Sequence, residues 1–277
     1  MVVNKKYFVV SDIHSFYNEM MKALNKQQFD INNKDHILCI AGDAFDRGSQ
    51  SKEMLQFMKF LGDRFIYVRG NHEDLLFDCV RDIVSGKTIG SHHFSNGTVK
   101  TIEQLCGLKE NELWFPRRSD SLNHTIHEKM KPVLEWINTK TVDFVVIGDC
   151  VIVHGWIPTT GDSMDFMGSW KNPKAIPMEE WEDCGIELWK QARWENGMKL
   201  WKNGVRIPDK TIICGHFHAS YGHSHLHQDR KEFPDKNRKE WQKSFVPFVD
   251  DGIIAIDSCC AYSGFLNCIT LEIEDEE

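Results

Sequence analysis

An apolar run leads directly into polar residues in the stretch Tyr7-Phe-Val-Val-Ser-Asp-Ile-His14. Residues 6–11 have the length and apolar content of a buried β-strand. Asp12 and His14 alternate at the end of this extended segment, so both side chains point to the same side. We therefore expect one carboxylate and one imidazole to reach a common point at this strand end.

Polar motifs follow apolar runs at four further places along the chain. They are Gly42-Asp43-Ala-Phe-Asp46-Arg47-Gly48, Gly70-Asn71-His72-Glu73, Val153-His154-Gly155 and Gly215-His216-Phe-His218. Open α/β sheets bind their ligands at the carboxyl ends of their strands. The sequence therefore predicts that the five motifs meet at one edge of a sheet.

The first third of the chain alternates strand-like runs with helical periodicity, which favours a mostly parallel sheet covered by helices. Two helices are predicted from apolar residues at helical spacing, namely Phe16, Met20, Ala23 and Leu24, and then Met54, Leu55, Met58 and Leu61. Strands are predicted at 6–11, 36–41, 64–69, 143–147, 150–153, 211–215, 252–257 and 265–273. Gly148-Asp149 is typical of a two-residue hairpin turn. We interpret residues 1–277 as a single catalytic α/β domain with insertions.

Three segments stand apart from this pattern. Residues 74–140 are charged and partly helical, and we predict a cap-like insertion there. Residues 156–205 form a Trp-rich insertion, for which we expect aromatic packing of helices on the core; contact with a substrate base or peptide is the alternative. Residues 222–249 are polar and charged, which indicates a surface excursion.

Composition limits the classes of protein that this chain can be. Its formal net charge is −8, which argues against a broad basic face for nucleic acid, although bound cations reverse the sign locally. No stretch approaches the roughly 18–20 apolar residues of a membrane span, and no signal peptide is visible. The nine cysteines fit reduced, buried thiols. We expect a cytoplasmic protein.

The donor set of the motifs favours borderline first-row cations such as manganese, iron or zinc. Carboxylate, amide and imidazole ligands suit these ions better than they suit calcium. The five motifs contain no cysteine, which argues against a closed structural zinc site. Two such ions about 3.5–4 Å apart would polarise phosphoryl oxygens and generate a bound hydroxide near neutral pH. The five motifs together therefore indicate a dinuclear phosphoester hydrolase.

These motifs closely resemble those of the calcineurin-like metallophosphoesterases. The motifs around Asp43 and His72 are similar to the phosphoprotein phosphatase branch, in which Glu73 replaces the Asp that is common elsewhere. Asn96-Gly97-Thr98-x-x-Thr101 is similar to a cap motif of bacterial and phage members, which include symmetrical diadenosine tetraphosphate hydrolases. Ile254-Ala-Ile-Asp257 is similar to their closing strand. The resemblance implies a β-sandwich of two mixed sheets flanked by helices, with a helical cap insertion.

The resemblance also implies the roles of the motif residues. The first ion would be held by Asp12, His14 and Asp43, and the second by Asp43, Asn71, His154 and His216. His72 would be the general acid, oriented by Asp46, because a carboxylate partner fixes the tautomer and raises the basicity of an imidazole. Arg47 would clamp the phosphate. A second clamp is expected, and Arg193 is our candidate.

The sequence departs from the family pattern at three places. His218 stands where many phosphoprotein phosphatases have no ligand, and we expect it to bind the first ion, as in the wider superfamily. The fourth motif has Trp156 after His154-Gly155, which would narrow the cleft. His223, His225 and His227 follow the fifth motif; an exposed polar loop is the favoured interpretation, and an extra metal site is the alternative.

The motifs predict the reaction better than the substrate, because function depends on the site and its surroundings. We expect a phosphomonoester on a protein Ser/Thr residue or a small metabolite. A dinucleoside polyphosphate is the alternative substrate, and a phosphodiester of a nuclease or cyclic-nucleotide phosphodiesterase comes third. A scaffold without catalytic activity is a further alternative, which predicts damaged metal ligands.

Overall fold

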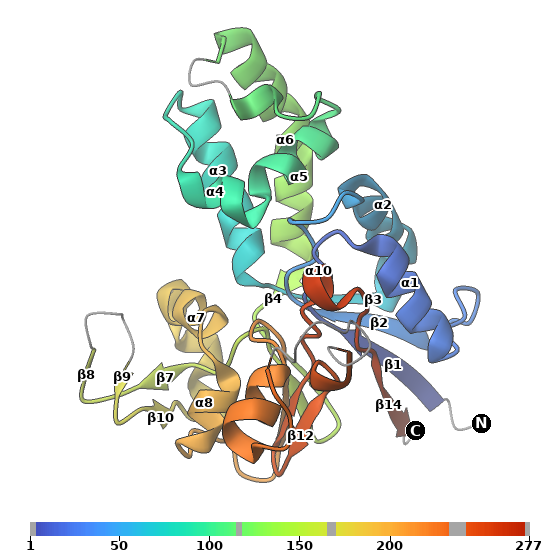
Figure 1. Ribbon diagram of the computed structural model, residues 1–277, viewed down its shortest axis with the longest axis vertical. Helices are drawn as coiled ribbons and strands as arrows, with labels where there is room; N and C mark the ends of the chain where they lie inside the picture. The colour runs from blue at the N-terminus through green and yellow to red at the C-terminus, as the bar shows by residue number, and fades with distance from the viewer. Residues whose placement is uncertain (1–3, 115–117, 165–169, 233–241, 275–277) are drawn as a thin grey trace.

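Two five-stranded sheets form the framework of the computed structural model, which describes residues 4–114, 118–164, 170–232 and 242–274. The first sheet has the order β14-β1-β2-β3-β4. Its strands are β1 (Asn4–Val10), β2 (His36–Ala41), β3 (Phe65–Val68), β4 (Thr141–Val142) and β14 (Ile269–Glu274). β1 to β4 run parallel, and β14 pairs antiparallel with β1 at the edge (Figure 1).

The second sheet has the order β12-β13-β11-β6-β5. Its strands are β5 (Val145–Ile147), β6 (Cys150–Ile152), β11 (Thr211–Cys214), β12 (Phe248–Asp250) and β13 (Ile253–Ala255). The three central strands run parallel, and the two edge strands pair antiparallel with their neighbours. Gly148 has φ +59° in the turn between β5 and β6. The predicted hairpin at this glycine is confirmed, because such tight turns require positive φ.

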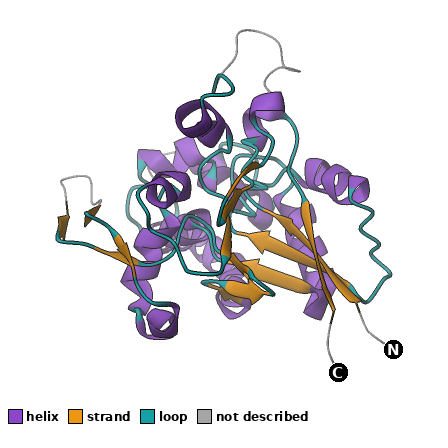
Figure 2. Ribbon diagram, turned by 90° about the horizontal axis from the view of Figure 1, so that it is seen from below, coloured by secondary structure: helices purple, strands orange, loops and turns teal. Residues whose placement is uncertain are grey.

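Side chains from both sheets form one apolar layer between them. The layer consists of Val9, Cys39, Ala41 and Val68 on the first sheet, and of Ile147, Ile152, Ile213 and Ile256 on the second. Packed inner faces of this kind define a β-sandwich. The predicted sandwich of two mixed sheets flanked by helices is therefore confirmed, and Figure 2 shows the strands within their helical surroundings.

Helices cover the outer face of the first sheet because their apolar residues recur at helical spacing. α1 (Tyr17–Lys26) buries Met20, Ala23 and Leu24, and α2 (Ser51–Leu61) buries Met54, Phe57, Met58 and Leu61. These residues join β1, β2 and β3 in the largest apolar cluster of the molecule. The two helices predicted from periodicity are thus present.

Four more helices rise above the first sheet in a separate helical part of the molecule (Figure 1). They are α3 (Asn71–Val84), α4 (Ser91–Asn96), α5 (Thr98–Cys106) and α6 (Asp120–Lys140). The described residues of segment 74–140 are helical and contain no strand. The role of this part as a cap stays a prediction.

The Trp-rich segment packs against the second sheet. It holds the helices α7 (Gly185–Arg193) and α8 (Gly197–Lys202) and the short ribbons β7 (Thr159–Thr160) with β10 (Lys174–Ala175), and β8 (Ser163–Met164) with β9 (Trp170–Lys171). Trp156, Trp181, Trp189 and Trp201 are buried in its core. This confirms the predicted packing role for these four residues. Trp194 differs, since it is 52% exposed.

Short helical turns complete the described chain. They are the 3₁₀ turns η1 (Gly62–Arg64), η2 (Glu112–Trp114) and η3 (Met178–Asp183), the π-helical turn η4 (Gly222–His227) and α10 (Cys260–Ser263). None of the helices in the described ranges is both long and apolar enough to cross a membrane.

The predicted surface excursion at 222–249 is wrong toward its two ends, although residues 225 and 227–231 between them are exposed. η4 buries Gly222 and His223, and the strand β12 buries Phe248 in the second core. A three-residue strand is too short to leave a readable alternation, so the sequence pattern missed it. Residues 233–241 of the predicted excursion lie outside the described residues.

Substitution of Ile213 by Ala tests the layer between the sheets. Ile213 is fully buried in β11, so the loss of its side chain should lower the free energy of unfolding by about 2–5 kcal/mol in urea denaturation. Val249→Ala is the control on β12, because Val249 is 58% exposed and should cost about 0.5 kcal/mol or less. Equal effects of the two substitutions would contradict the position of Ile213 in this layer.

Candidate metal centre

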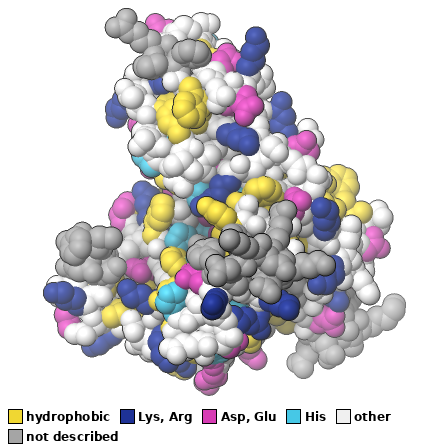
Figure 3. Space-filling view, in the orientation of Figure 1, with side chains coloured by type: hydrophobic (Ala, Val, Ile, Leu, Met, Phe, Trp, Pro, Cys, Tyr) yellow, Lys and Arg dark blue, Asp and Glu magenta, His cyan; other side chains and the backbone are white. Residues whose placement is uncertain are grey.

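Loops at the carboxyl ends of five strands meet in one cleft. β1, β2 and β3 of the first sheet precede Asp12 and His14, Asp43, and Asn71, while β6 and β11 of the second sheet precede His154 and His216. A cavity of about 160 Å³ is lined by eight of the predicted site residues, Asp12, His14, Asp43, Arg47, Asn71, His72, His216 and His218. Histidine side chains are visible in the middle of the face that Figure 3 shows. The five motifs thus converge, but at the junction of two sheets and not at the edge of a single sheet as predicted.

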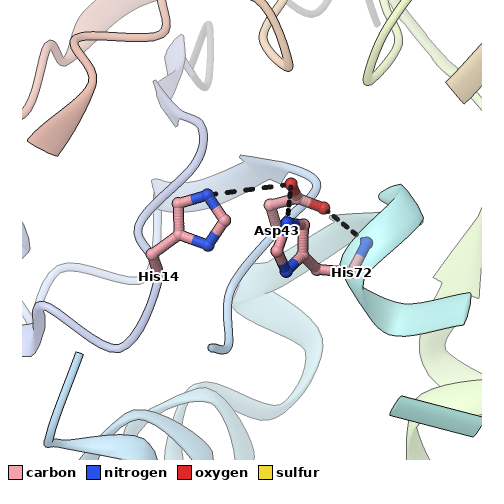
Figure 4. A group of neighbouring side chains, drawn as sticks. All are labelled: His14, Asp43 and His72. Atoms are coloured by element: carbon pink, nitrogen blue, oxygen red, sulfur yellow. Dashed lines mark hydrogen bonds and ion pairs between the residues drawn. The ribbon is translucent and has the colours of Figure 1, made fainter. Parts of the chain in front are cut away.

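Asp43 lies at the centre of these side chains. Its Oδ2 atom is 3.8 Å from Nε2 of both His14 and His72 (Figure 4), and its Oδ1 atom is 3.3 Å from Nε2 of His154. Burial alone would raise the pKa of Asp43, but the His154 and His72 imidazoles hold it well below the ordinary value. The carboxylate is therefore ionised, with both oxygens directed at imidazoles.

The second sheet contributes His154 and His216. Nδ1 of His154 donates to the Ala41 carbonyl at 2.9 Å, and Nε2 lies 2.8 Å from Oδ1 of Asn71. Burial lowers the pKa of His154, but the Asp43 carboxylate outweighs burial and raises it to about 10, so without a metal both ring nitrogens carry protons. A bound cation would take the place of the proton on Nε2. Burial, followed by the neighbouring His154, lowers the pKa of His216 to about 3, so His216 is neutral and able to bind a metal.

The cleft also holds more carboxylate than its side-chain partners neutralise. Burial and the Asp257 carboxylate raise the pKa of Asp12 well above its ordinary value, and burial likewise raises the pKa of Asp257. Buried carboxylates of this kind are stabilised by a bound cation. The burial and crowding of these groups therefore fit a cation-binding site.

Ligand atoms of two residue groups lie within 4.8 Å of one another, which is close enough for each group to share one ion. The first group is His14, Asp43 and His72, and the second is Asp43, His154 and His216. Asp43 belongs to both groups, so the arrangement fits two cations bridged by one carboxylate. The grouping contains His72 where the sequence analysis expected Asp12.

A second carboxylate, that of Glu73, holds the loops around Asp43 in place. Its Oε2 accepts the backbone N–H groups of Asp43 at 3.0 Å and Gly70 at 2.8 Å. Its Oε1 accepts the Ala44 N–H at 3.1 Å and the Tyr67 hydroxyl at 2.6 Å. Glu73 is fully buried, so it connects the ends of β2 and β3 rather than facing the cleft.

The backbone of the site adopts a conformation that side chains other than Gly rarely take. Asp12, His14, Asp43, Asp46, Arg47 and His216 all have φ between 49° and 78°. Glycines permit close approaches beside them: a Cβ on Gly70 would lie 2.1 Å from Oδ1 of Asp43, and one on Gly215 would lie 2.2 Å from Oδ2 of Asp12. Strain of this kind is concentrated at functional sites.

His72 is oriented by Asp46, as the sequence analysis predicted. Nδ1 of His72 donates to Oδ2 of Asp46 at 2.7 Å, and the Thr98 hydroxyl donates to the same oxygen at 2.7 Å. Burial opposes protonation, but the carboxylates of Asp43 and Asp46 outweigh it and raise the pKa of His72. The Nε2 edge of the ring is thereby directed at the cleft.

The two arginines occupy different environments. Arg47 lines the cleft and also an adjacent groove of about 390 Å³. Arg193 is buried and pairs instead with Asp74, at 2.7 Å, and with Asp143. The structure therefore does not bring Arg193 to the cleft wall; its neighbour Trp194 lies there, 5.7 Å from the His216 ring centroid.

The structure locates the residues at which the sequence departs from the family pattern. His218 lines the cleft, and its ring lies 2.7 Å from the Ser220 hydroxyl and 3.5 Å from Glu232. Trp156 is buried behind the site, where its Nε1 donates to Val205, so it does not narrow the cleft. His223 is buried, which makes the favoured prediction of an exposed loop wrong for this residue.

Sequence reasoning gave no role to several residues that line the cleft. Asp257 follows the apolar strand β13, the same signal that identified the five motifs. Asn96 belongs to the predicted cap motif, and Cys259 lies next to Asp257. Trp194 carried no such signal, because its exposure depends on how α7 packs.

Comparison with known proteins agrees with this arrangement. The sequence profile of the calcineurin-like phosphoesterases matches residues 5–246. The chain belongs to the calcineurin-like phosphoesterase family. The matched range includes all five motifs.

Individual relatives of this calcineurin-like phosphoesterase match over shorter lengths or with low identity. The symmetrical bis(5'-nucleosyl)-tetraphosphatase of Buchnera aphidicola is 38% identical over 80 residues, which are 29% of this chain and 28% of that protein. The enzyme of the same name from Proteus mirabilis is 38% identical over 66 residues, 24% of this chain and 23% of that protein. A solved cold-active protein tyrosine phosphatase is 17% identical, with a TM-score of 0.44 over 96% of this chain and 73% of its own.

Substitution of Glu73 by Gln should destabilise the folded chain. An amide NH₂ group at the Oε2 position would face two N–H donors, whereas at the Oε1 position it would face only the Ala44 N–H, because the Tyr67 hydroxyl can turn and accept. One backbone N–H then loses its acceptor, so we expect a loss of about 1–3 kcal/mol in urea denaturation. Tyr67→Phe is the control, because it removes one donor and leaves the carboxylate in place. If Glu73→Gln costs no more than Tyr67→Phe, the connection between the two loops is not structurally important.

Substitution of Asp12 by Asn should stabilise the metal-free chain at pH 8. Burial, followed by the Asp257 carboxylate, raises the pKa of Asp12 in the fold, so ionisation at pH 8 opposes folding, and Asn removes that cost. Below about pH 4 the carboxyl is protonated in both folded and unfolded chains, so the gain should vanish. Urea denaturation with chelator at both pH values measures this. A gain that persists at low pH would point to a cause other than charge.

Proposed function

We propose that this chain is a metal-dependent phosphoesterase whose cleft binds two divalent cations and hydrolyses phosphomonoesters. The observation that carries the proposal is the position of Asp43 in two groups of side chains that could each hold a metal ion. Asp12, His14, Asp43 and His218 would hold the first ion. Asp43, Asn71, His154 and His216 would hold the second.

The donors of the cleft support a first-row transition ion. Imidazole and carboxylate ligands suit manganese, and also iron or zinc, better than calcium. When bound, two such ions polarise phosphoryl oxygens and activate water near neutral pH. The protein supplies ionised Asp43 and neutral His216 in the protonation states that metal binding needs.

His72 is proposed as the general acid. Its Nδ1 is occupied by Asp46, and Nε2 faces the cleft, so a proton on Nε2 could be given to the leaving oxygen. The raised pKa keeps more of the imidazole protonated at neutral pH than an ordinary histidine. Asp46 and Thr98 keep the ring in this orientation, so they are positioning residues.

Arg47 is proposed to bind the phosphate of the substrate. Its guanidinium lines the cleft, and a planar fork of donors matches phosphoryl oxygens. Arg193 was the candidate for a second clamp, but its ion pairs with Asp74 and Asp143 occupy it. We therefore propose that Arg47 acts without Arg193.

A phosphoserine or phosphothreonine side chain, or a small phosphorylated metabolite, is the proposed substrate. The groove beside the cleft favours a second candidate, a dinucleoside polyphosphate. Trp114 and Tyr262 line this groove with 62% and 59% of their surfaces exposed, and Arg47 connects it to the cleft. Aromatic faces of this kind stack on nucleobases. The partial identity with symmetrical bis(5'-nucleosyl)-tetraphosphatases supports the same candidate.

Free cysteines such as Cys39 and Cys214 support a cytoplasmic location.

The proposed substrates are distinguished by incubating the manganese-loaded protein with a phosphoserine peptide, where released phosphate is measured, and in parallel with diadenosine tetraphosphate, where the nucleotide products are resolved. Fast turnover of the peptide supports the phosphatase. Preferred cleavage to two ADP supports the dinucleoside polyphosphate, and Trp114→Ala should then raise KM at least tenfold on that substrate alone. No hydrolysis of either substrate or of p-nitrophenyl phosphate would reject the proposed activity.

Substitution of His72 by Asn should reduce the turnover of substrates with poor leaving groups more than the turnover of substrates with good ones. A general acid contributes about 10²–10⁴-fold, so the phosphoserine peptide should lose that much in kcat, whereas p-nitrophenyl phosphate should lose far less. The bound metal should stay at the wild-type level, as measured by elemental analysis. Asp43→Asn is the contrasting variant and should lose both metal and turnover. Equal slowing of both substrates by His72→Asn would show that His72 is not the acid.

A further inference from the structure

Three side chains that the metal centre does not use converge just beyond the fifth motif. They are His223, His227 and Asp229, and their ligand atoms lie within 4.8 Å of one another. We propose that they form a separate binding site for one divalent transition-metal ion, of which Zn²⁺ is the best match. The site shares no residue with the cleft.

The π-helical turn η4 places the two histidines on one face. It covers Gly222–His227, and residues four apart in a helix lie above one another. Gln228 then takes φ +55° and reverses the chain, so that the Asp229 N–H donates to the His223 carbonyl at 3.1 Å. The Asp229 carboxylate is thereby returned to His223. Single π-helical turns occur often at functional sites.

Phe248 of β12 fixes both imidazole rings. Its ring centroid is 5.7 Å from that of His223 and 4.6 Å from that of His227. Gly222 allows this contact, because a Cβ there would lie 2.4 Å from the Phe248 ring. The two histidines are therefore held against a buried side chain before any ion binds, which lowers the entropic cost of binding.

His223 carries a lone pair that the described residues leave without a hydrogen-bond donor. Its Nε2 donates to the Val246 carbonyl at 3.3 Å, so in the neutral imidazole Nδ1 carries the lone pair. Nδ1 is buried and has no hydrogen-bond partner within the described part of the chain, and the Asp229 Oδ1 lies 3.4 Å away. A nitrogen lone pair and a carboxylate that face each other at this distance are both satisfied by a cation.

His227 has the outer partner that metal-binding histidines usually have. Its Nε2 donates to Oδ2 of Asp250 at 2.7 Å, which leaves the lone pair on Nδ1. Carboxylates in this position fix the tautomer and raise the basicity of a metal-binding imidazole. Both histidines are therefore oriented by an acceptor on β12 or two residues before it.

The donors define the class of ion. Two imidazoles and one carboxylate with a fourth position open to solvent match the tetrahedral ligand sets of zinc. Magnesium and calcium prefer sets made of oxygen atoms, so they fit poorly. His227 and Asp229 are exposed, which gives the ion a path of entry.

Metal content tests the site without any measurement of activity. The whole chain is freed of metal with chelator, dialysed against buffered free Zn²⁺ and analysed for zinc per protein. His227→Ala should bind one zinc fewer than the wild type. His225→Ala is the matched control, because His225 lies on the same turn, 50% exposed and outside the three-residue group, and should keep that zinc. Asp250→Asn should weaken the affinity by about 10–100-fold.

Asp43→Asn separates this site from the cleft. It should lose zinc from the cleft and retain the equivalent that His227→Ala removes, so failure of the proposed function and failure of this site give different results. Equal zinc contents of His227→Ala and the wild type would overturn the site. An equal loss in His225→Ala would also overturn it, since it would show unspecific binding along the turn.

Discussion

The buried carboxylate of Glu73 is the interaction on which the cleft depends. Three backbone N–H groups from the loops after β2 and β3, together with the Tyr67 hydroxyl, donate to its two oxygens. Charge-assisted hydrogen bonds of this kind are strong in a buried environment. They hold the loop of Asp43, whose φ of 56° is rare for a side chain other than Gly, and the Asp43 carboxylate thereby faces His14, His72 and His154.

The sequence predicted the site best where a polar or ionisable residue directly follows an apolar strand. Most of the strands and the convergence of Asp12, Asp43 and His154 could be predicted, because apolar runs and the polar residues after them follow local rules. The division into two mixed sheets was implied by the family resemblance, and the short strands β4 and β12 were not predicted. Arg193 could not be placed, because its position depends on Asp74 and Asp143, which are far away in sequence. His223 was misjudged for the same reason, since its burial depends on Phe248.

Arg47 links two features that the sequence treats separately. Its side chain lines both the cleft and the aromatic groove. A Cβ atom on Gly97 would lie only 2.4 Å from the backbone nitrogen of Arg47. Gly97 belongs to the helical part of residues 71–140, so this part packs directly on the loop of the second motif. Substrate preference can therefore change through α4, α5 and η2 without any change in the metal ligands.

The cleft lies where the two sheets of the sandwich meet, and its side chains come from both. Asp12, Asp43 and Asn71 follow strands of one sheet, whereas His154 and His216 follow strands of the other. Ions bound as proposed would have ligands on both sheets and would therefore link them. Ligands that bind only the native state shift the folding equilibrium toward it. Metal supply then governs how long the chain survives proteolysis, so scarcity would reduce the amount of protein as well as its turnover.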